Sequence, residues 1–208
     1  MKKFILMLMA LLAGCSAEEP QPVNPTETAS YRENQKAPTT LVSNEKPASV
    51  STEPTLETTG IKPASLSIPK LEIDAPIKEF GLDSEGSMEV PENGVDVAWF
   101  EPGIQPGQKG NAVLAGHVDD EKQPAVFFRL KELVPGDKIF LQDETGKTLT
   151  FMVREKEAYQ KDDAPLRKVF GPGEKRMLNL ITCTGYFDRD IHNYVERLVI
   201  FTELVEVS

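Results

Sequence analysis

The chain of 208 residues is poor in the side chains that bind zinc and other transition metals, with only two cysteines and two histidines. These four residues do not have the spacing of zinc ligands, and the glycines at positions 103, 107 and 110 lie in a proline-containing turn region rather than at a helix start. We therefore expect no metal site, no phosphate-binding loop and no cofactor. Acidic residues outnumber basic ones, and the net charge of −10 argues against a nucleic-acid-binding protein.

Long apolar runs are also missing, except near the N-terminus, where residues 4–12 are almost wholly apolar and follow Lys2 and Lys3. This run is too short to span a bilayer, and its basic flank and small-residue exit are typical of a signal peptide. The next residues, Leu12-Ala13-Gly14-Cys15, resemble the lipobox of bacterial lipoproteins. The resemblance implies cleavage before Cys15 and a diacylglyceryl thioether on its sulfur, a stable anchor in the outer leaflet of the membrane. An ordinary signal peptide that happens to contain a cysteine is the alternative.

Residues 15–60 have few apolar side chains and many prolines, threonines, serines and glutamates. This composition buries too little apolar surface to offset the entropy of ordering, so we predict an extended tether that follows a signal peptide of residues 1–14. Residues 61–208 are long enough for one domain with a well-buried core. In an exported protein two cysteines first suggest a disulfide, but here it would use the lipid-bearing Cys15. We predict no disulfide, which leaves Cys183 available for chemistry.

Short apolar runs separated by turn signals indicate that the domain is rich in strands. The runs cover residues 64–68, 73–77, 97–100, 111–117, 138–142, 148–159, 177–182 and 194–205. Two segments have helical spacing: residues 125–134, which end at a Pro-Gly pair, and residues 163–170, with Asp162 or Asp163 as the N-cap. The pattern predicts a mainly β fold, in which a mainly antiparallel sheet closes into a small barrel with one or two short helices.

Three side chains near the ends of these runs are candidates for a shared site. His117 closes one run, Cys183 directly follows another, and Arg197 lies in the last. A thiol beside an imidazole can become a thiolate nucleophile, and a fixed cation can stabilise the oxyanion of an acyl-transfer intermediate. Each residue also has an ordinary structural explanation: a buried cysteine, a strand-end histidine bonded to a loop carbonyl, and a surface arginine paired with Glu196 or Glu203.

Other polar residues near the cysteine are expected to play smaller parts. Arg189 and His192 belong to the polar stretch 188–193, which we interpret as a loop. Arg197 is preferred over Arg189 as the functional cation, because a strand holds a side chain more firmly than a loop does. Thr182 either supports the cysteine and the oxyanion or simply reflects the β propensity of threonine.

An acidic run, Asp119-Asp120-Glu121, comes shortly after His117. Carboxylates are the ligands that calcium prefers, but this run lacks a loop of alternating ligands. We therefore expect a solvated acidic turn here, and we interpret Asp162-Asp163 in the same way.

The three candidate motifs together resemble those of the sortases. A run that ends in Ala115-Gly116-His117 resembles the histidine motif of that family, and Leu180-Ile181-Thr182-Cys183 resembles its TLxTC motif. Arg197, fourteen residues beyond the cysteine and on the next run, matches the arginine of the family. Residues 126–130 and Thr184-Gly185 are most similar to class F, with class D next.

The resemblance implies an eight-stranded β-barrel and a cysteine transpeptidase in which His117, Cys183 and Arg197 are catalytic and Thr182 assists them. Such an enzyme cuts an LPxTG-like sorting signal between Thr and Gly through a thioester on the cysteine. It then transfers the acyl group to an amine, usually of a peptidoglycan precursor. One position departs from the motif: Asn179 stands where the first threonine of TLxTC is usual. In the family this residue lies near the substrate groove, so the departure concerns which sorting-signal sequence the enzyme prefers.

The lipobox is a second departure, because sortases are more often held by an N-terminal membrane helix. We expect a monomeric, lipid-anchored protein on the extracellular face of a Gram-positive cell membrane, reaching into the cell wall. Two alternatives keep the fold: a cysteine hydrolase that uses water as the acceptor, and a non-catalytic binding lipoprotein. An L,D-transpeptidase fits less well, because its arginine would follow the cysteine almost immediately, whereas Thr184-Gly185-Tyr186 follow Cys183.

Overall fold

The computed structural model describes residues 59–120 and 123–208. The predicted signal peptide, the predicted lipid attachment at Cys15 and almost all of the predicted tether lie outside these residues. Within the two described ranges, no helix has the length and apolar character needed to cross a membrane.

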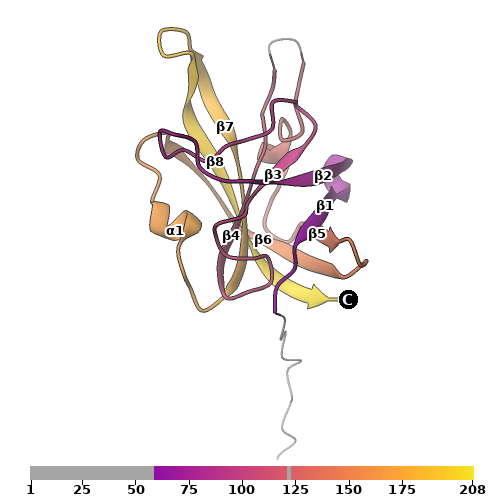
Figure 1. The fold of residues 1–208 in the computed structure, drawn as a ribbon. Helices are drawn as coiled ribbons and strands as arrows, with labels where there is room; N and C mark the ends of the chain where they lie inside the picture. Colours follow the sequence, from indigo (N-terminus) through magenta and orange to yellow (C-terminus); the bar gives the residue numbers. More distant parts are fainter. Residues whose placement is uncertain (1–58, 121–122) are drawn as a thin grey trace, which may run out of the picture. The chain divides into compact units, whose positions relative to one another are not determined.

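Eight strands close into a barrel in the order β1-β2-β3-β4-β7-β8-β6-β5 (Figure 1). Pairing of β1 with β5 closes it, and two neighbouring pairs, β2–β3 and β4–β7, are parallel. The mainly β barrel predicted from the sequence is therefore confirmed. The strands are β1 (Pro63–Ile68), β2 (Ile73–Phe80), β3 (Val97–Phe100), β4 (Gly110–Ala115), β5 (Lys138–Asp143), β6 (Thr148–Gln160), β7 (Arg176–Asp188) and β8 (Asn193–Val207).

Helical structure in the described residues is limited to the 3₁₀ turns η1 (Pro69–Leu71) and η2 (Leu130–Glu132) and the helix α1 (Leu166–Phe170). The longer helix expected at 125–134 is wrong, because only η2 is helical there. The apolar residues of that segment are nevertheless fully buried, and they recur every third position: Phe127, Leu130 and Leu133. A spacing of three suits 3₁₀ turns, in which side chains at i and i+3 align.

The short helix α1 lies inside the segment where a helix was expected, but its start differs. Pro165 is its N-cap residue, and no side chain there bonds to the first turn. The predicted cap by Asp162 or Asp163 is therefore wrong. Proline at the cap has a fixed φ and needs no hydrogen-bond partner for its nitrogen, so it marks the start of the helix without a polar cap.

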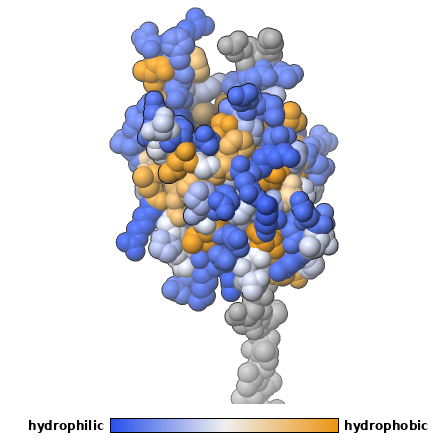
Figure 2. Space-filling view, in the orientation of Figure 1, coloured by the Kyte–Doolittle hydropathy of each residue, from blue (hydrophilic) through white to orange (hydrophobic). Residues whose placement is uncertain are grey.

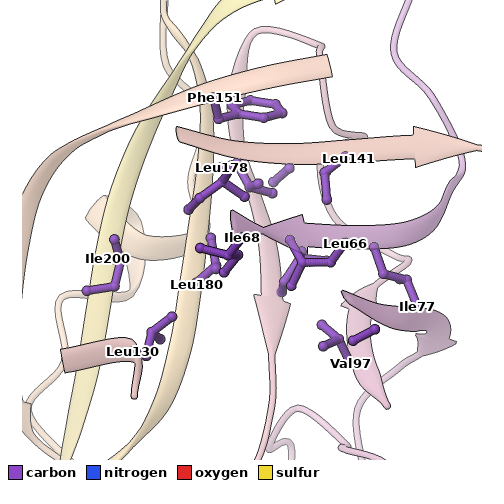
Figure 3. Packing of buried hydrophobic residues seen from close by; sticks show 14 of the residues in the cluster. Leu66, Ile68, Ile77, Val97, Leu130, Leu141, Phe151, Leu178, Leu180 and Ile200 are labelled. Atoms are coloured by element: carbon purple, nitrogen blue, oxygen red, sulfur yellow. The ribbon is translucent and has the colours of Figure 1, made fainter. Parts of the chain in front are cut away.

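Alternate side chains of the strands fill the interior of the barrel (Figure 3). Leu66 and Ile68 of β1 share one cluster with Leu178 and Leu180 of β7 and Ile200 of β8, and all five are almost wholly buried. Burial of one such side chain contributes about 1.5–3 kcal/mol relative to its exposure. The core therefore fixes which residues of β7 and β8 face inward.

A smaller apolar cluster lies on the other face of β7 and β8. Val169 of α1 packs there against Val199 and Phe201 of β8, with Ile181 of β7 partly buried beside them. Successive residues of a strand point to opposite faces. The residues of β7 and β8 that alternate with the core positions therefore point out of the barrel, and Cys183 belongs to this outward set with Ile181.

Asn179 also points outward from β7, and it is fully buried. Its Nδ2 donates to the carbonyl oxygen of Val169 at 2.6 Å and to Oδ1 of Asn111 at 3.4 Å. Nδ2 of Asn111 in turn donates to the carbonyl oxygen of Gly171 at 2.7 Å. The residue that departs from the TLxTC pattern thus ties α1 to β4 and β7, and it does not line the pocket at Cys183.

Candidate active site

Cys183 and Arg197 lie directly opposite each other in the antiparallel pair of β7 and β8. Cys183 is a free, half-buried thiol on the outward face of β7. Arg197 shares the outward face of β8 with Val199, so the two side chains leave the sheet on the same side. The cation is therefore held on the outer wall of the barrel beside the thiol and does not enter the core.

The guanidinium of Arg197 is held by neutral oxygens of its own hairpin. Nη1 donates to the carbonyl oxygens of Tyr194 and Glu196 at 2.9 and 3.0 Å, and Nη2 donates to Oδ1 of Asn193 at 3.0 Å. No ion pair found among the described residues includes Arg197, and Glu203 pairs instead with Arg154 and Lys175. The positive charge is thus fixed in place without a partner carboxylate.

The hairpin between β7 and β8 places the competing candidates away from the thiol. β7 continues past the cysteine to Asp188 and β8 begins at Asn193, so the polar stretch 188–193, interpreted as a loop, is a four-residue turn at 189–192 with a strand residue at each end. Arg189 and His192 are exposed in this turn, and His192 has a left-handed backbone with φ of 49°. Neither lines the pocket at Cys183.

His117 follows β4, the parallel neighbour of β7. Ala115 pairs with Ile181, and the Gly116 N–H donates to the Ile181 carbonyl oxygen at 3.1 Å. His117 and Cys183 each come two residues after this last pair, so His117 leaves the end of β4 beside the part of β7 that carries Cys183. A side chain on Gly116 would meet the Phe127 ring at 2.8 Å, which explains a glycine before the histidine.

The His117 ring is oriented by a loop carbonyl. This is the contact expected if His117 were only a structural histidine at a strand end. Nε2 lies 2.7 Å from the carbonyl oxygen of Pro91. A carbonyl oxygen only accepts hydrogen bonds, so Nε2 carries the proton and donates it. In the neutral ring Nδ1 is then the nitrogen with a free lone pair. His117 is not among the residues that line the pocket at Cys183.

Thr182 precedes the cysteine and points inward, with 4% of its surface exposed. Its hydroxyl donates to the carbonyl oxygen of Gly116 at 2.8 Å. Because a hydroxyl has one proton, this bond leaves none for an oxyanion. The contact instead ties the residue before Cys183 to the residue before His117, which favours a supporting role.

A pocket of about 160 Å³ opens at Cys183. Its walls include Asp119 from the segment after β4, Tyr194 from β8, and the pair Phe128 and Lys131, whose ammonium lies 5.0 Å from the centre of the Phe128 ring. The segment after β4 and the β7–β8 hairpin project from the same end of the barrel (Figure 1). The pocket therefore lies where these two projections face each other.

The surface around this end is mainly hydrophilic, with apolar side chains on the hairpin itself (Figure 2). Tyr186, Phe187 and Ile191 are exposed there, and the Phe187 ring packs edge-on against Tyr194 with centroids 5.4 Å apart. The aromatic contact steadies Tyr194 at the mouth of the pocket. A second hollow of about 590 Å³ adjoins on the other side of Phe128, between β2 and residues 123–129.

Asp119 is the residue of this site that the sequence analysis missed. The Tyr194 hydroxyl donates to its Oδ2 at 2.5 Å, so the acidic turn expected to be solvated contributes a half-buried wall of the pocket. This hydrogen bond is the main reason that the pKa of Tyr194 rises to about 12, and the phenol stays protonated. The two residues are 75 positions apart, and no local pattern relates them.

The pKa of the Cys183 thiol is raised above its usual value. Burial is the largest cause, because it disfavours the charged thiolate; the nearby Arg197 lowers the pKa and Asp119 raises it. The thiol is therefore mainly protonated at neutral pH, and the thiolate is a minority form. Arg197 is the charge that favours it.

Replacing Asp119 by Asn is expected to lower the pKa of the Cys183 thiol, and replacing Arg197 by Gln is expected to raise it further, because each change removes one of the two charges that act on the thiolate. The measurement is the pH dependence of alkylation by iodoacetamide in a chain with Cys15→Ala, in which Cys183 is the only thiol. Asp120→Asn removes the same charge outside the pocket and is the control. A common midpoint in all variants would contradict this electrostatic account.

Comparison with known proteins identifies the family to which this barrel belongs. Residues 66–205 match the sortase domain, which is more than half of the chain, and the protein belongs to the sortase family. At the level of the family it is a cysteine transpeptidase of the kind that acts on sorting signals at the cell surface. A comparison with curated protein sequences found no match.

Solved sortase structures have the same fold. A lid mutant of sortase A from Corynebacterium diphtheriae is 22% identical, with a TM-score of 0.56 over 74% of this chain and 75% of that one. Sortase C1 of Streptococcus agalactiae, in complex with MTSET, is 23% identical, with a TM-score of 0.54 over 68% and 66%. Sortase A of Listeria monocytogenes is 18% identical, with a TM-score of 0.53 over 69% and 87%. At such identities the likeness concerns the fold.

Proposed function

We propose that this sortase cleaves an LPxTG-like sorting signal through a thioester on Cys183 and transfers the acyl group to an amine of the cell wall. The observation that carries the proposal is the cross-strand pairing of Cys183 with Arg197, whose charge has no carboxylate partner among the described residues. A fixed cation beside a thiol supports both formation of the thiolate and binding of an oxyanion. Neither role is needed by a purely structural cysteine.

In the first half of the reaction the Cys183 thiolate attacks the carbonyl carbon of the signal's Thr. A C–S bond forms, and the oxyanion of the tetrahedral intermediate accepts hydrogen bonds from the Arg197 guanidinium. The C–N bond then breaks, and protonated His117 gives its proton to the leaving amine through Nδ1, while Nε2 keeps its bond to Pro91. The products are the thioester and a new N-terminal amine.

In the second half an acceptor amine attacks the thioester. The new C–N bond forms, neutral His117 takes a proton from the attacking nitrogen, and the C–S bond breaks to release the thiolate. The enzyme returns to its starting ionic state. In this proposal Thr182 holds the part of β7 that carries Cys183, through its bond to Gly116.

The proposal for the cellular setting rests on the N-terminal sequence. Cleavage before Cys15 and lipidation of its sulfur would anchor a monomer to the outer face of a Gram-positive membrane, and residues 15–60 would carry the domain towards the cell wall. Residues 126–130 and the Thr184-Gly185 pair support placement in class F, with class D next.

The decisive experiment is intact-mass spectrometry of the purified protein mixed with a panel of LPxTG-like peptides. The expected result is an acyl adduct that maps to the Cys183 peptide and is converted to an amide product by added triglycine. Prompt hydrolysis that triglycine cannot divert would instead indicate a cysteine hydrolase of the same fold. No adduct with any peptide, together with a Cys183 thiol inert to alkylation, would favour the binding lipoprotein.

A further inference from the structure

One charged group at the site has no part in the steps proposed above. Asp119 lines the pocket with Cys183, is half-buried, and accepts the Tyr194 hydrogen bond on Oδ2. Within residues 59–120 and 123–208, none of the ion pairs found includes Asp119. The carboxylate is thus steadied by a neutral phenol, and Oδ1 has no partner among the hydrogen bonds found there.

The carboxylate works against the nucleophile that it faces, since it adds to the rise in the pKa of the Cys183 thiol. Its presence in the pocket therefore needs a different reason. The two cations near it do not supply one: Lys131 lies over the Phe128 ring, and Arg197 is bonded to neutral oxygens. A fixed anion beside the reacting sulfur is complementary to a cationic ligand.

The acceptor of the second half-reaction is such a ligand. The ordinary pKa of an α-amino group is about 7.7–8.0, so at neutral pH most amines arrive as ammonium ions. We propose that Asp119, positioned by Tyr194, binds the ammonium of the incoming acceptor beside the Cys183 thioester and so favours primary amines over water. The inference rests on the proposed acyl transfer and adds the residue that recognises its second substrate.

The proton balance of this step is complete with groups already present. The bound ammonium first loses one proton to solvent at the mouth of the pocket. The free amine attacks the thioester, its second proton passes to neutral His117, and the C–S bond breaks to give the Cys183 thiolate. Asp119 itself takes no proton; it raises the local concentration of the amine and orients its nitrogen.

The test compares a cationic with an uncharged acceptor on the full-length protein. The preformed thioester is challenged with triglycine, which is mainly an ammonium ion at neutral pH, and with hydroxylamine, which is mainly uncharged. The measured quantity is the acceptor concentration at which half of the thioester is converted to the amide product and half is hydrolysed. Asp119→Asn is expected to raise this concentration about tenfold for triglycine, because the variant loses one charge-assisted hydrogen bond to the ammonium group. The corresponding concentration for hydroxylamine should change less than about twofold.

Two further variants separate recognition from general damage. Asp120→Asn removes the same charge from the next, exposed residue and should leave both concentrations close to wild type. Tyr194→Phe removes the hydroxyl that positions the carboxylate and should raise the half-maximal triglycine concentration about threefold. Equal effects of Asp119→Asn on both acceptors, or no effect on either, would overturn the inference. Absence of any thioester in the wild type would instead overturn the proposed function.

Discussion

Replacement of Cys183 by Ala is expected to abolish acyl transfer, so that neither a cleaved sorting-signal peptide nor a thioester is detected. By comparison with other enzymes that lose a covalent nucleophile, the rate should fall by about 10⁴-fold or more. The proposed reaction passes through a C–S bond that alanine cannot form, although Arg197 and the pocket remain in place. The measurement is cleavage of a fluorogenic LPxTG-like peptide by the purified variant.

Cys183→Ser is the matched variant, because it replaces the thiol by a hydroxyl of similar size. It should also be inactive, since a serine hydroxyl has far less anionic form than a thiol at the same pH. Thermal unfolding should show that both variants fold, because Cys183 is only half-buried. A folded Cys183→Ala protein that still supports every cell-surface function of the wild type would favour the non-catalytic lipoprotein.

The strand pattern of this chain could be predicted because each strand has one apolar face. The expected runs at 64–68 and 148–159 agree with β1 and β6 to within one residue at each end. Residues 125–134 were wrongly predicted to form a helix, because an apolar period of three and one of 3.6 differ little over ten residues. Which strands pair across the barrel was also not evident, since β4 and β7 are separated by about 60 residues.

The candidate site was predicted only in part, for a similar reason. His117, Cys183 and Arg197 could be named as candidates because each stands at or beside an apolar run and lies in a stretch that resembles a motif of the sortases. The pairing of Cys183 with Arg197 required the register of β7 and β8, which single runs do not contain. Asp119 was interpreted as part of a solvated turn because its partner, Tyr194, comes 75 residues later.

Arg197→Gln is expected to lower kcat by about 10²–10³-fold, the effect of removing one oxyanion donor from a comparable site. The KM for the sorting-signal peptide should change much less, because the lost hydrogen bond is strongest in the transition state. The control is Arg189→Gln, which removes the same charge from the exposed turn of the same hairpin. A larger loss from Arg189→Gln than from Arg197→Gln would contradict the assignment of the cation.

Arg197→Lys separates the charge of this residue from its hydrogen-bond geometry. Lysine keeps the positive charge beside Cys183, so the pKa of the thiol should move less than in Arg197→Gln. Lysine lacks the planar guanidinium that is hydrogen-bonded to Tyr194, Glu196 and Asn193. Its N–H donors are therefore expected to be misplaced relative to the oxyanion, and kcat should fall about tenfold. If kcat falls while the alkylation profile stays near wild type, Arg197 acts on the oxyanion. If kcat falls by the same factor as the fraction of Cys183 present as thiolate at the assay pH, the main effect of Arg197 is on the thiolate.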